Sequence, residues 1–416
     1  MNFKPKCFLL IMAFLLLTVS LSIPEEKKEE GVIAFVGGTL IDGTGASPIS
    51  NTVVLVQGEK IKAVGPANQI KIPEGAKRID VSGKYLLPGF IDLHIHVTFP
   101  YSEIQYHTDS LSLKTLRAVH VMEMMLRTGV TSVRDVGAPV EPMQALLSAQ
   151  KLGYIDTIRL FSCGGLITTT GGHGDGVPGN IAVDGPWEFR KAVREMAKAG
   201  FRHIKISPTY TLEEAKAAVD EANIQGMKIT SHGGGLSDTI PTSMTRIAVE
   251  AGVACIEHLN EMDDDILDLI AKKGVYIVPT LAAYRELYKA KEISRYLIEK
   301  RHWTVSMHET LFKKARDRKI VMGIGTDVVD HFMELYPGIY LTEMKYYVEL
   351  GASPMETIVA ATKIGALILG LADELGTIEA GKLADLQVIS GDPLKSFDSL
   401  GHPEIVMIGG KIHQLK

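Results

Sequence analysis

Eight short apolar runs alternate with amphipathic helical stretches through the middle of this chain, and this alternation limits the fold more than any other feature. A strand that is followed by a helix pairs in parallel with a later strand of the same sheet. Eight such units in succession predict a closed α/β barrel, the (β/α)8 or TIM barrel, over residues 87–375. The runs are residues 90–96, 132–136, 158–163, 203–207, 228–232, 254–258, 275–280 and 320–327.

Two β-rich segments flank the predicted barrel. Residues 31–86 contain three strand-like runs separated by glycine, proline and asparagine, and residues 376–416 contain two more, at 384–389 and 405–408. Such punctuation is typical of turns between strands. Neither segment has enough apolar side chains for a core of its own. We therefore expect both chain ends to pair into one small β-sandwich domain.

The composition fits a folded protein and gives no indication of nucleic-acid binding. Of the 416 residues, 46% are hydrophobic and 22% are charged. This balance is typical of globular chains. The formal net charge is -5, so the basic excess that marks a nucleic-acid-binding protein is missing.

The N-terminus resembles a targeting segment. Lys4 and Lys6 give it a positive start, residues 7–19 are mostly apolar, and small serines follow. This order predicts a signal peptide over residues 1–22, and hence an exported protein, either periplasmic or secreted. An uncleaved membrane anchor is the alternative, because the apolar run is only slightly too short to span a bilayer. The membrane is a partner only in that second case.

Potential metal ligands stand at or near the ends of the predicted strands. Two histidines that are two residues apart in a strand point to the same side, so the pair in the first run faces one space. Catalytic groups of such barrels lie at the carboxyl ends of the strands. We therefore expect six side chains to meet at one mouth of the barrel. They are His94, His96, Lys205, His232, His258 and Asp327.

Six potential ligands are too many for one zinc ion. A catalytic zinc usually takes three protein ligands and a water molecule, whereas six suit two divalent metals that share a bridge. Imidazole and carboxylate favour zinc, with manganese, cobalt or iron as substitutes. Any one of these histidines alone has a structural explanation, and Asp327 alone could cap a helix. Their joint placement at strand ends predicts the metal site.

Lys205 is the unusual member of the set. A protonated lysine repels a metal ion. Burial beside cations lowers the pKa of a lysine, and the neutral amine can react with carbon dioxide. The resulting carbamate is equivalent to a carboxylate and can bridge two ions. A salt-bridged structural lysine is the alternative.

Several stretches of the sequence resemble the amidohydrolase superfamily. The match includes the Leu-Pro-Gly-Phe-Ile-Asp-Leu-His-Ile-His stretch of the first barrel strand and the segment through which the chain returns to the β-domain. The matching segments are residues 87–96, 129–137, 256–258, 325–327 and 375–386. The resemblance covers nearly the whole chain after residue 22. It implies the barrel, the β-domain and a metal-dependent hydrolase acting on carbon–nitrogen bonds.

Within that superfamily the chain resembles the imidazolonepropionase-like branch, which includes prolidase-like binuclear Xaa-Pro dipeptidases. Lys205 occupies the carbamate position of the binuclear members, and residues 170–174 resemble a loop that approaches the substrate. The resemblance implies that His94 and His96 bind one metal together with Asp327, that His232 and His258 bind the other, and that carboxylated Lys205 bridges them. One position departs from the pattern: Gly234 stands where the branch often has a second histidine. The missing side chain leaves a wider mouth and suits a bulkier substrate.

The expected reaction is hydrolysis of an amide bond in a dipeptide or an N-acyl amino acid. In this hypothesis a hydroxide bridging the two metals attacks the carbonyl carbon, and Asp327 transfers the proton to the leaving amine. His173, in the loop after the third strand, either donates to the developing oxyanion or holds a substrate carboxylate. A histidine of a mobile loop, without a catalytic role, is the alternative for this residue.

Two other functions remain open from the sequence. The first is a hydrolase or deaminase of the same fold that acts on a cyclic amide or amidine, for which a single metal would be expected. The second is a non-catalytic barrel that binds a metal or a solute. Retention of both Lys205 and Asp327 argues against the second, since binding alone needs no proton-transferring carboxylate. The oligomeric state is also open, with a homo-oligomer among the options.

Overall fold

The computed structural model describes residues 31–99, 103–234, 243–260, 262–289, 304–328 and 338–413. The predicted signal peptide, residues 1–22, lies outside the described residues, so its cleavage and the export of the protein stay predictions. Within the described part of the chain, no helix is both long and apolar enough to cross a membrane.

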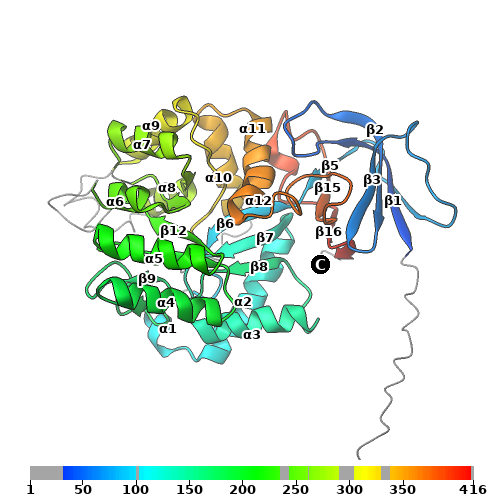
Figure 1. The fold of residues 1–416 in the computed structure, drawn as a ribbon. Coiled ribbons are helices and arrows are strands. Elements are labelled where there is room, and N and C mark those ends of the chain that lie inside the picture. Colours follow the sequence, from blue (N-terminus) through cyan, green and yellow to red (C-terminus); the bar gives the residue numbers. More distant parts are fainter. Residues whose placement is uncertain are drawn as a thin grey trace, which may run out of the picture.

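The two chain ends form one branched β-sheet, drawn in blue and red in Figure 1. The strands follow the order β17-β16-β15-β5-β1-β2-β3, and β4 pairs with β1. The strands are β1 (Val32–Leu40), β2 (Ile49–Gln57), β3 (Lys60–Pro66), β4 (Lys77–Asp80), β5 (Lys84–Pro88), β15 (Leu386–Ser390), β16 (Ile405–Ile408) and β17 (Lys411–His413).

The contact between the two ends runs along β5 and β15, which are antiparallel over their whole length, from Leu386 opposite Pro88 to Ser390 opposite Lys84. Phe35, Val54 and Leu386 are fully buried in the core beneath this sheet. This core takes apolar side chains from both ends, so the two ends share one small β-structure, which is a single branched sheet.

Seven of the eight predicted runs are barrel strands. They pair in parallel in two sections, β6-β7-β8 and β10-β9-β11-β12-β13-β14. Two short strands, β9 and β10, were not predicted. The strands are β6 (Phe90–Ile95), β7 (Val130–Asp135), β8 (Arg159–Ser162), β9 (Ile167–Thr168), β10 (Ile181–Ala182), β11 (His203–Ile206), β12 (Lys228–His232), β13 (Cys255–Glu257) and β14 (Tyr276–Val278).

The eighth run, residues 320–327, is not a regular strand, although it occupies the eighth position. Its backbone bonds to both neighbours: Gly323 N donates to Ile277 O of β14, and Leu93 N of β6 donates to Ile324 O. A Cβ atom on Gly323 would lie only 2.4 Å from Leu93 Cδ1, so the segment packs closely against β6 and a larger residue would require the Leu93 side chain to move. Among the described residues a continuous ladder that closes the barrel is not detected. The eighth segment nevertheless joins the two edges through β14 and β6.

Helices cover the outside of the barrel strands (Figure 1). Their starts carry ordinary capping signals, such as the reciprocal Thr211–Glu214 pair at the start of α5. The helices are α1 (Glu103–Thr108), α2 (Leu111–Leu126), α3 (Val140–Lys151), α4 (Pro186–Lys198), α5 (Leu212–Ile224), α6 (Ser243–Ala251), α7 (Asp264–Lys273), α8 (Leu281–Lys289), α9 (Val305–Asp317), α10 (Gly338–Glu349), α11 (Pro354–Val359), the π-helical turn Ala360–Ile364, α12 (Gly365–Leu369) and the 3-10 turn Phe397–Ser399.

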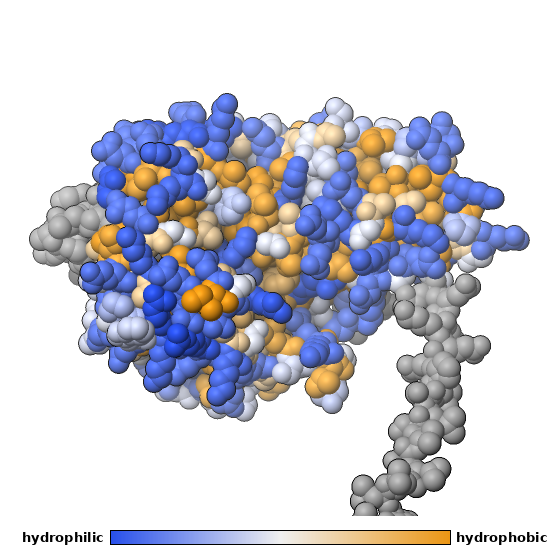
Figure 2. Space-filling view, viewed as in Figure 1, coloured by the Kyte–Doolittle hydropathy of each residue, from blue (hydrophilic) through white to orange (hydrophobic). Residues whose placement is uncertain are grey.

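Most of the long helices bury an apolar stripe. In α7, for example, Ile266, Leu267 and Ile270 are fully buried while the acidic and basic residues of the same helix face outward. Figure 2 shows the outcome on one face of the molecule, where hydrophilic residues cover much of the surface and smaller apolar patches lie among them. The fold thus leaves the ends of the strands as the place where buried polar groups gather.

Candidate metal centre

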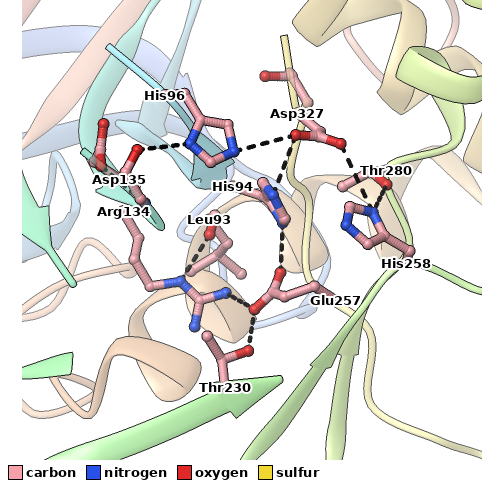
Figure 3. Close-up of polar contacts among 12 residues, drawn as sticks. Leu93, His94, His96, Arg134, Asp135, Thr230, Glu257, His258, Thr280 and Asp327 are labelled. Atoms are coloured by element: carbon pink, nitrogen blue, oxygen red, sulfur yellow. Dashed lines mark hydrogen bonds and ion pairs between the residues drawn. The ribbon is translucent and has the colours of Figure 1, made fainter. Parts of the chain in front are cut away.

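Three of the predicted ligands, His94, His96 and His258, lie around the carboxylate of a fourth, Asp327 (Figure 3). Its Oδ1 atom is 3.2 Å from His94 Nε2 and 3.5 Å from His96 Nε2, and its Oδ2 atom is 3.8 Å from His258 Nδ1. His94, His258 and Asp327 each offer one ligand atom, and these three atoms lie within 4.8 Å of one another. That spacing is compatible with a single ion held between them.

The other three predicted residues extend this cluster. The His232 ring lies 4.5 Å from the His258 ring and 4.4 Å from the His173 ring, centroid to centroid. Lys205 of β11 is buried, and its positive charge acts on the pKa of His94, His232 and His258. The structure therefore brings all seven residues of the predicted site together. The function of each one stays a prediction.

Burial lowers the pKa of several groups in the cluster, whereas the pKa of His94 is raised, because Asp327 and Glu257 outweigh its burial. Burial lowers the pKa of His232 and His258 well below the usual histidine value, and the nearby Lys205 lowers both further. Burial also lowers the pKa of Lys205, against the opposing effect of Glu257 and Asp327. Neutral imidazole is the form of histidine that binds metals, and a neutral lysine amine is the form that reacts with carbon dioxide. The donor set of imidazoles and a carboxylate thus fits divalent metal ions.

Glu257 is a buried carboxylate directly behind His94, and the sequence analysis did not select it. Its Oε2 atom lies 2.7 Å from His94 Nδ1, while Oε1 accepts from Arg134 Nη2 at 2.5 Å and from the Thr230 hydroxyl (Figure 3). Burial by itself raises the pKa of Glu257, but Arg134 and His94 lower it by more, so the net shift is downward. Glu257 therefore holds the His94 ring so that Nε2 points toward Asp327. The available signal was its place just before His258 in the matching segment.

Two further buried aspartates fix the backbone around the ligands, and the sequence analysis missed both. Asp92 accepts from the backbone N–H of His94 and of Thr326, each at 3.1 Å. Asp135 accepts from Val97 N at 2.8 Å and from Gly137 N at 3.1 Å. Both aspartates lie in segments that match the superfamily, which was the only sequence signal for them.

Left-handed backbone is concentrated at this centre. His258, Thr280 and Asp327 have φ angles of +70°, +50° and +49°. Such a conformation costs on the order of 1–3 kcal/mol per residue and is rare for a β-branched residue such as threonine. The hydroxyl of Thr280 lies 2.7 Å from His258 Nδ1, so two of the strained residues hold each other. Strain of this kind typically persists where the geometry serves a function.

The loops at the mouth carry the remaining predicted features. His173 is half-buried, and its backbone N–H donates to Pro208 O at 2.9 Å. Burial lowers the pKa of its imidazole. Gly234 has a φ angle of +82° and donates its N–H to Thr245 Oγ1 at 2.7 Å. A histidine at position 234 would be strained in this conformation. The left-handed backbone at position 234 therefore favours the glycine that stands there in place of the histidine often found in the branch.

A (β/α)8 architecture with a cluster of histidines and a carboxylate at the strand ends defines the class of metal-dependent barrel hydrolases. The family model described as the amidohydrolase family matches residues 85–413, and the chain belongs to this family. Members of the family generally use divalent metals. The protein is therefore a hydrolase that acts on carbon–nitrogen bonds.

Individual relatives cover nearly the whole chain. Ochratoxinase from Aspergillus niger is 25% identical over 443 residues, covering 92% of this chain and 87% of the relative. Imidazolonepropionase from Rhizobium rhizogenes is 24% identical over 387 residues, covering 83% and 88%. The solved structure of a Xaa-Pro dipeptidase with bound methionine in the active site is 28% identical, with a TM-score of 0.83, and covers 92% of this chain and 100% of that one. These relatives confirm the resemblance to the imidazolonepropionase-like and prolidase-like branch.

Proposed function

We propose that this protein hydrolyses an amide bond in a small substrate, a dipeptide or an N-acyl amino acid, with two divalent metal ions. The observation that carries the proposal is the position of Asp327, whose carboxylate lies within 3.8 Å of ring nitrogens of His94, His96 and His258. The similarity to a Xaa-Pro dipeptidase over 92% of this chain supports the choice of bond. Zinc is the expected metal, because imidazole and carboxylate donors favour it.

In this proposal each metal has its own pair of histidines. His94 and His96, at the end of β6, hold the first ion together with Asp327. His232 and His258, whose rings lie 4.5 Å apart, hold the second. Lys205 is buried beside this cluster, and in carboxylated form it would bridge the two ions.

When bound, the two ions lower the pKa of water toward neutrality and polarise the substrate carbonyl. The side chains of this chain then have separate tasks. Asp327 accepts the proton of the attacking water and passes it to the leaving amine; its side chain is 20% exposed, so substrate can reach it from the mouth. His173, beside His232, donates to the oxyanion or holds the substrate carboxylate.

A second candidate function is hydrolysis or deamination of a cyclic amide. The similarity to imidazolonepropionase over 83% of this chain favours it. The left-handed Gly234, which leaves no histidine at that point of the mouth, suits a substrate of another shape than a dipeptide. We propose further that residues 1–22 direct export, and that the mature protein works outside the cytoplasm.

A metal count combined with a substrate screen tests the proposal. Purified protein is analysed for bound metals and then incubated with a library of dipeptides, N-acyl amino acids and cyclic amides. We expect about two metals per chain and release of a free amino acid, with Asp327→Asn as the inactive control. One metal per chain, no amide cleavage and turnover of a cyclic amide would favour the second candidate. No bound metal and no turnover would contradict both.

A further inference from the structure

Helix α10 carries a buried polar stripe that faces the barrel. Tyr340, Glu343 and Tyr347 are spaced by three and four residues and therefore lie on one side of the helix. All three are buried, and Glu343 is fully so. A buried carboxylate on an outer helix is costly unless it is bound by donors. The proposed mechanism uses none of these residues.

The Glu343 carboxylate binds the start of α8. Its Oε1 atom accepts from Leu281 N at 3.1 Å and its Oε2 atom from Ala282 N at 2.5 Å. These are the first two N–H groups of α8, which have no partner within the helix. Once ionised, above its pKa of about 8, the carboxyl group also complements the helix dipole. Glu343 thus fixes the position at which α8 begins.

The residue before α8 is Thr280, which contacts a predicted metal ligand. Thr280 is fully buried, has a left-handed backbone, and places its hydroxyl 2.7 Å from His258 Nδ1. A continuous set of contacts therefore runs from Glu343 through the start of α8 and Thr280 to the His258 ring. Among the described residues, Glu343 is the carboxylate that contacts the first two N–H groups of α8.

The two tyrosines of the stripe hold α10 in place against the other ligand-bearing segments. The Tyr340 hydroxyl donates to Ile91 O at 3.0 Å, three residues before His94 on β6. The Tyr347 hydroxyl donates to Gly323 O at 2.9 Å, four residues before Asp327. One face of α10 therefore contacts the segments that carry His94, His96 and Asp327.

We infer that Glu343 is a positioning residue of the metal centre, which sets the orientation of His258 through Thr280 and the first turn of α8. This inference rests on the proposed function, since it takes His258 as a metal ligand. A group that orients a ligand typically accounts for about 10-fold to 100-fold in metal affinity. Removing Glu343 should therefore lower the affinity for the ion on the His258 side, in addition to any general loss of stability.

The test compares metal release at pH 8.5, above the pKa of Glu343, from three variants of the zinc-loaded full chain. Glu343→Leu removes both oxygens that accept from the start of α8, and Glu343→Gln keeps one accepting oxygen. The matched control is Glu214→Leu, because Glu214 is another buried glutamate whose two oxygens accept backbone N–H groups, from Gly185 and Thr211, each at 2.7 Å. The measurements are zinc equivalents per chain, the rate of zinc release to a chelator, and the melting temperature without added metal.

We expect Glu343→Leu to release one of its two zinc equivalents at least about 10-fold faster than the wild type. Glu343→Gln should be intermediate, which is the rescue that a specific role requires. Glu214→Leu should melt at a lower temperature but release zinc at the wild-type rate. Wild-type release in Glu343→Leu, at a lowered melting temperature, would overturn the inference and leave the proposed function intact. A wild-type protein that binds no zinc would overturn the proposed function and this inference with it.

Thr280→Val keeps the test decisive if Glu343→Leu does not fold. It removes the hydroxyl that contacts His258 and leaves the carboxylate at α8 in place. If the effect of Glu343 passes through Thr280, the double variant Glu343→Gln/Thr280→Val releases zinc no faster than Thr280→Val alone. Additive effects of the two substitutions would show that they act independently and would overturn the inference.

Discussion

The Oε2 atom of Glu257 lies 2.7 Å from Nδ1 of His94, on the side of the imidazole ring opposite the nitrogen that faces Asp327. A carboxylate in this position fixes both the tautomer and the ring orientation of a metal-binding histidine. Glu257 is itself held by Arg134, and the guanidinium and the carboxylate are both buried. The structure therefore places a fully buried ion pair directly behind the candidate metal centre.

Glu257→Gln should unfold more readily than the wild type. The substitution leaves the Arg134 charge buried without its anionic partner, and breaking a buried pair in this way costs about 3–5 kcal/mol. Urea unfolding of both metal-free proteins measures the difference, and Gln57, a polar strand residue outside the barrel, offers Gln57→Ala as a control with little effect. Equal stability of wild type and Glu257→Gln would show that Arg134 does not depend on this carboxylate.

Asp327→Asn should remove catalysis while leaving much of the metal bound. The amide keeps an oxygen near His94 and His96 but cannot accept the proton of the attacking water. We expect a fall in kcat of at least about 100-fold, the lower range for loss of a general acid–base group. Steady-state kinetics and metal analysis on the same preparation check this. Activity close to that of the wild type would exclude Asp327 as the proton carrier.

Lys205 should make metal loading depend on bicarbonate. A carbamate forms on the neutral amine from dissolved carbon dioxide, and burial lowers the pKa of this lysine, which favours the neutral form. Reconstitution of metal-free protein with zinc should therefore be faster and more complete with added bicarbonate, and Lys205→Ala should show no such dependence. A wild-type protein that loads equally in bicarbonate-free buffer would contradict the proposed bridge.

Stability should fall between about pH 5 and pH 8 because of Glu343. Burial raises the pKa of this carboxyl from 4.5 to about 8, against the two backbone N–H groups that lower it; Asp92 of β6 raises the pKa further, and Arg285 of α8 lowers it. A raised folded-state pKa means that the folded chain binds the proton more tightly than the unfolded chain. The stabilisation of the folded chain that comes from this tighter proton binding is complete below about pH 4.5 and is lost as the pH rises through about 8.

The comparison with Glu343→Gln isolates this effect, since glutamine has no proton to lose while Tyr340, Tyr347 and the other surrounding groups are shared. The melting temperature of the wild type should decrease relative to that of Glu343→Gln as the pH is raised from 5 to 8.5. A difference that stays constant over this range would mean that Glu343 does not titrate there.

The sequence was sufficient for the parts of this molecule that depend on local pattern. The barrel strands are short apolar runs between helices, and His94, His96, His232 and His258 stand at or just beyond their ends, where parallel strands bring side chains together. The small sheet followed from the same reasoning, because neither chain end could form a core alone. These features need no knowledge of distant contacts.

The missed features depend on contacts between distant segments. Glu257 and Arg134 are 123 residues apart, and nothing near either residue shows that they pair. Glu343 lies in an ordinary helical stretch, where a glutamate usually faces solvent. The eighth run has the apolar character of a strand, but its backbone pairs with β14 and β6 only at single positions, around Met322–Gly323 and Ile324. Each of these outcomes is decided by tertiary packing.

The number of metal ions bound by the purified wild-type chain tests the central claim most directly. Elemental analysis against protein concentration gives this number without knowledge of the substrate. The cluster of His94, His96, Lys205, His232, His258 and Asp327 predicts about two divalent ions per chain, and about one in a His232→Ala/His258→Ala variant. A wild-type protein that binds one ion or none after incubation with zinc and bicarbonate would contradict the binuclear centre and the function proposed from it.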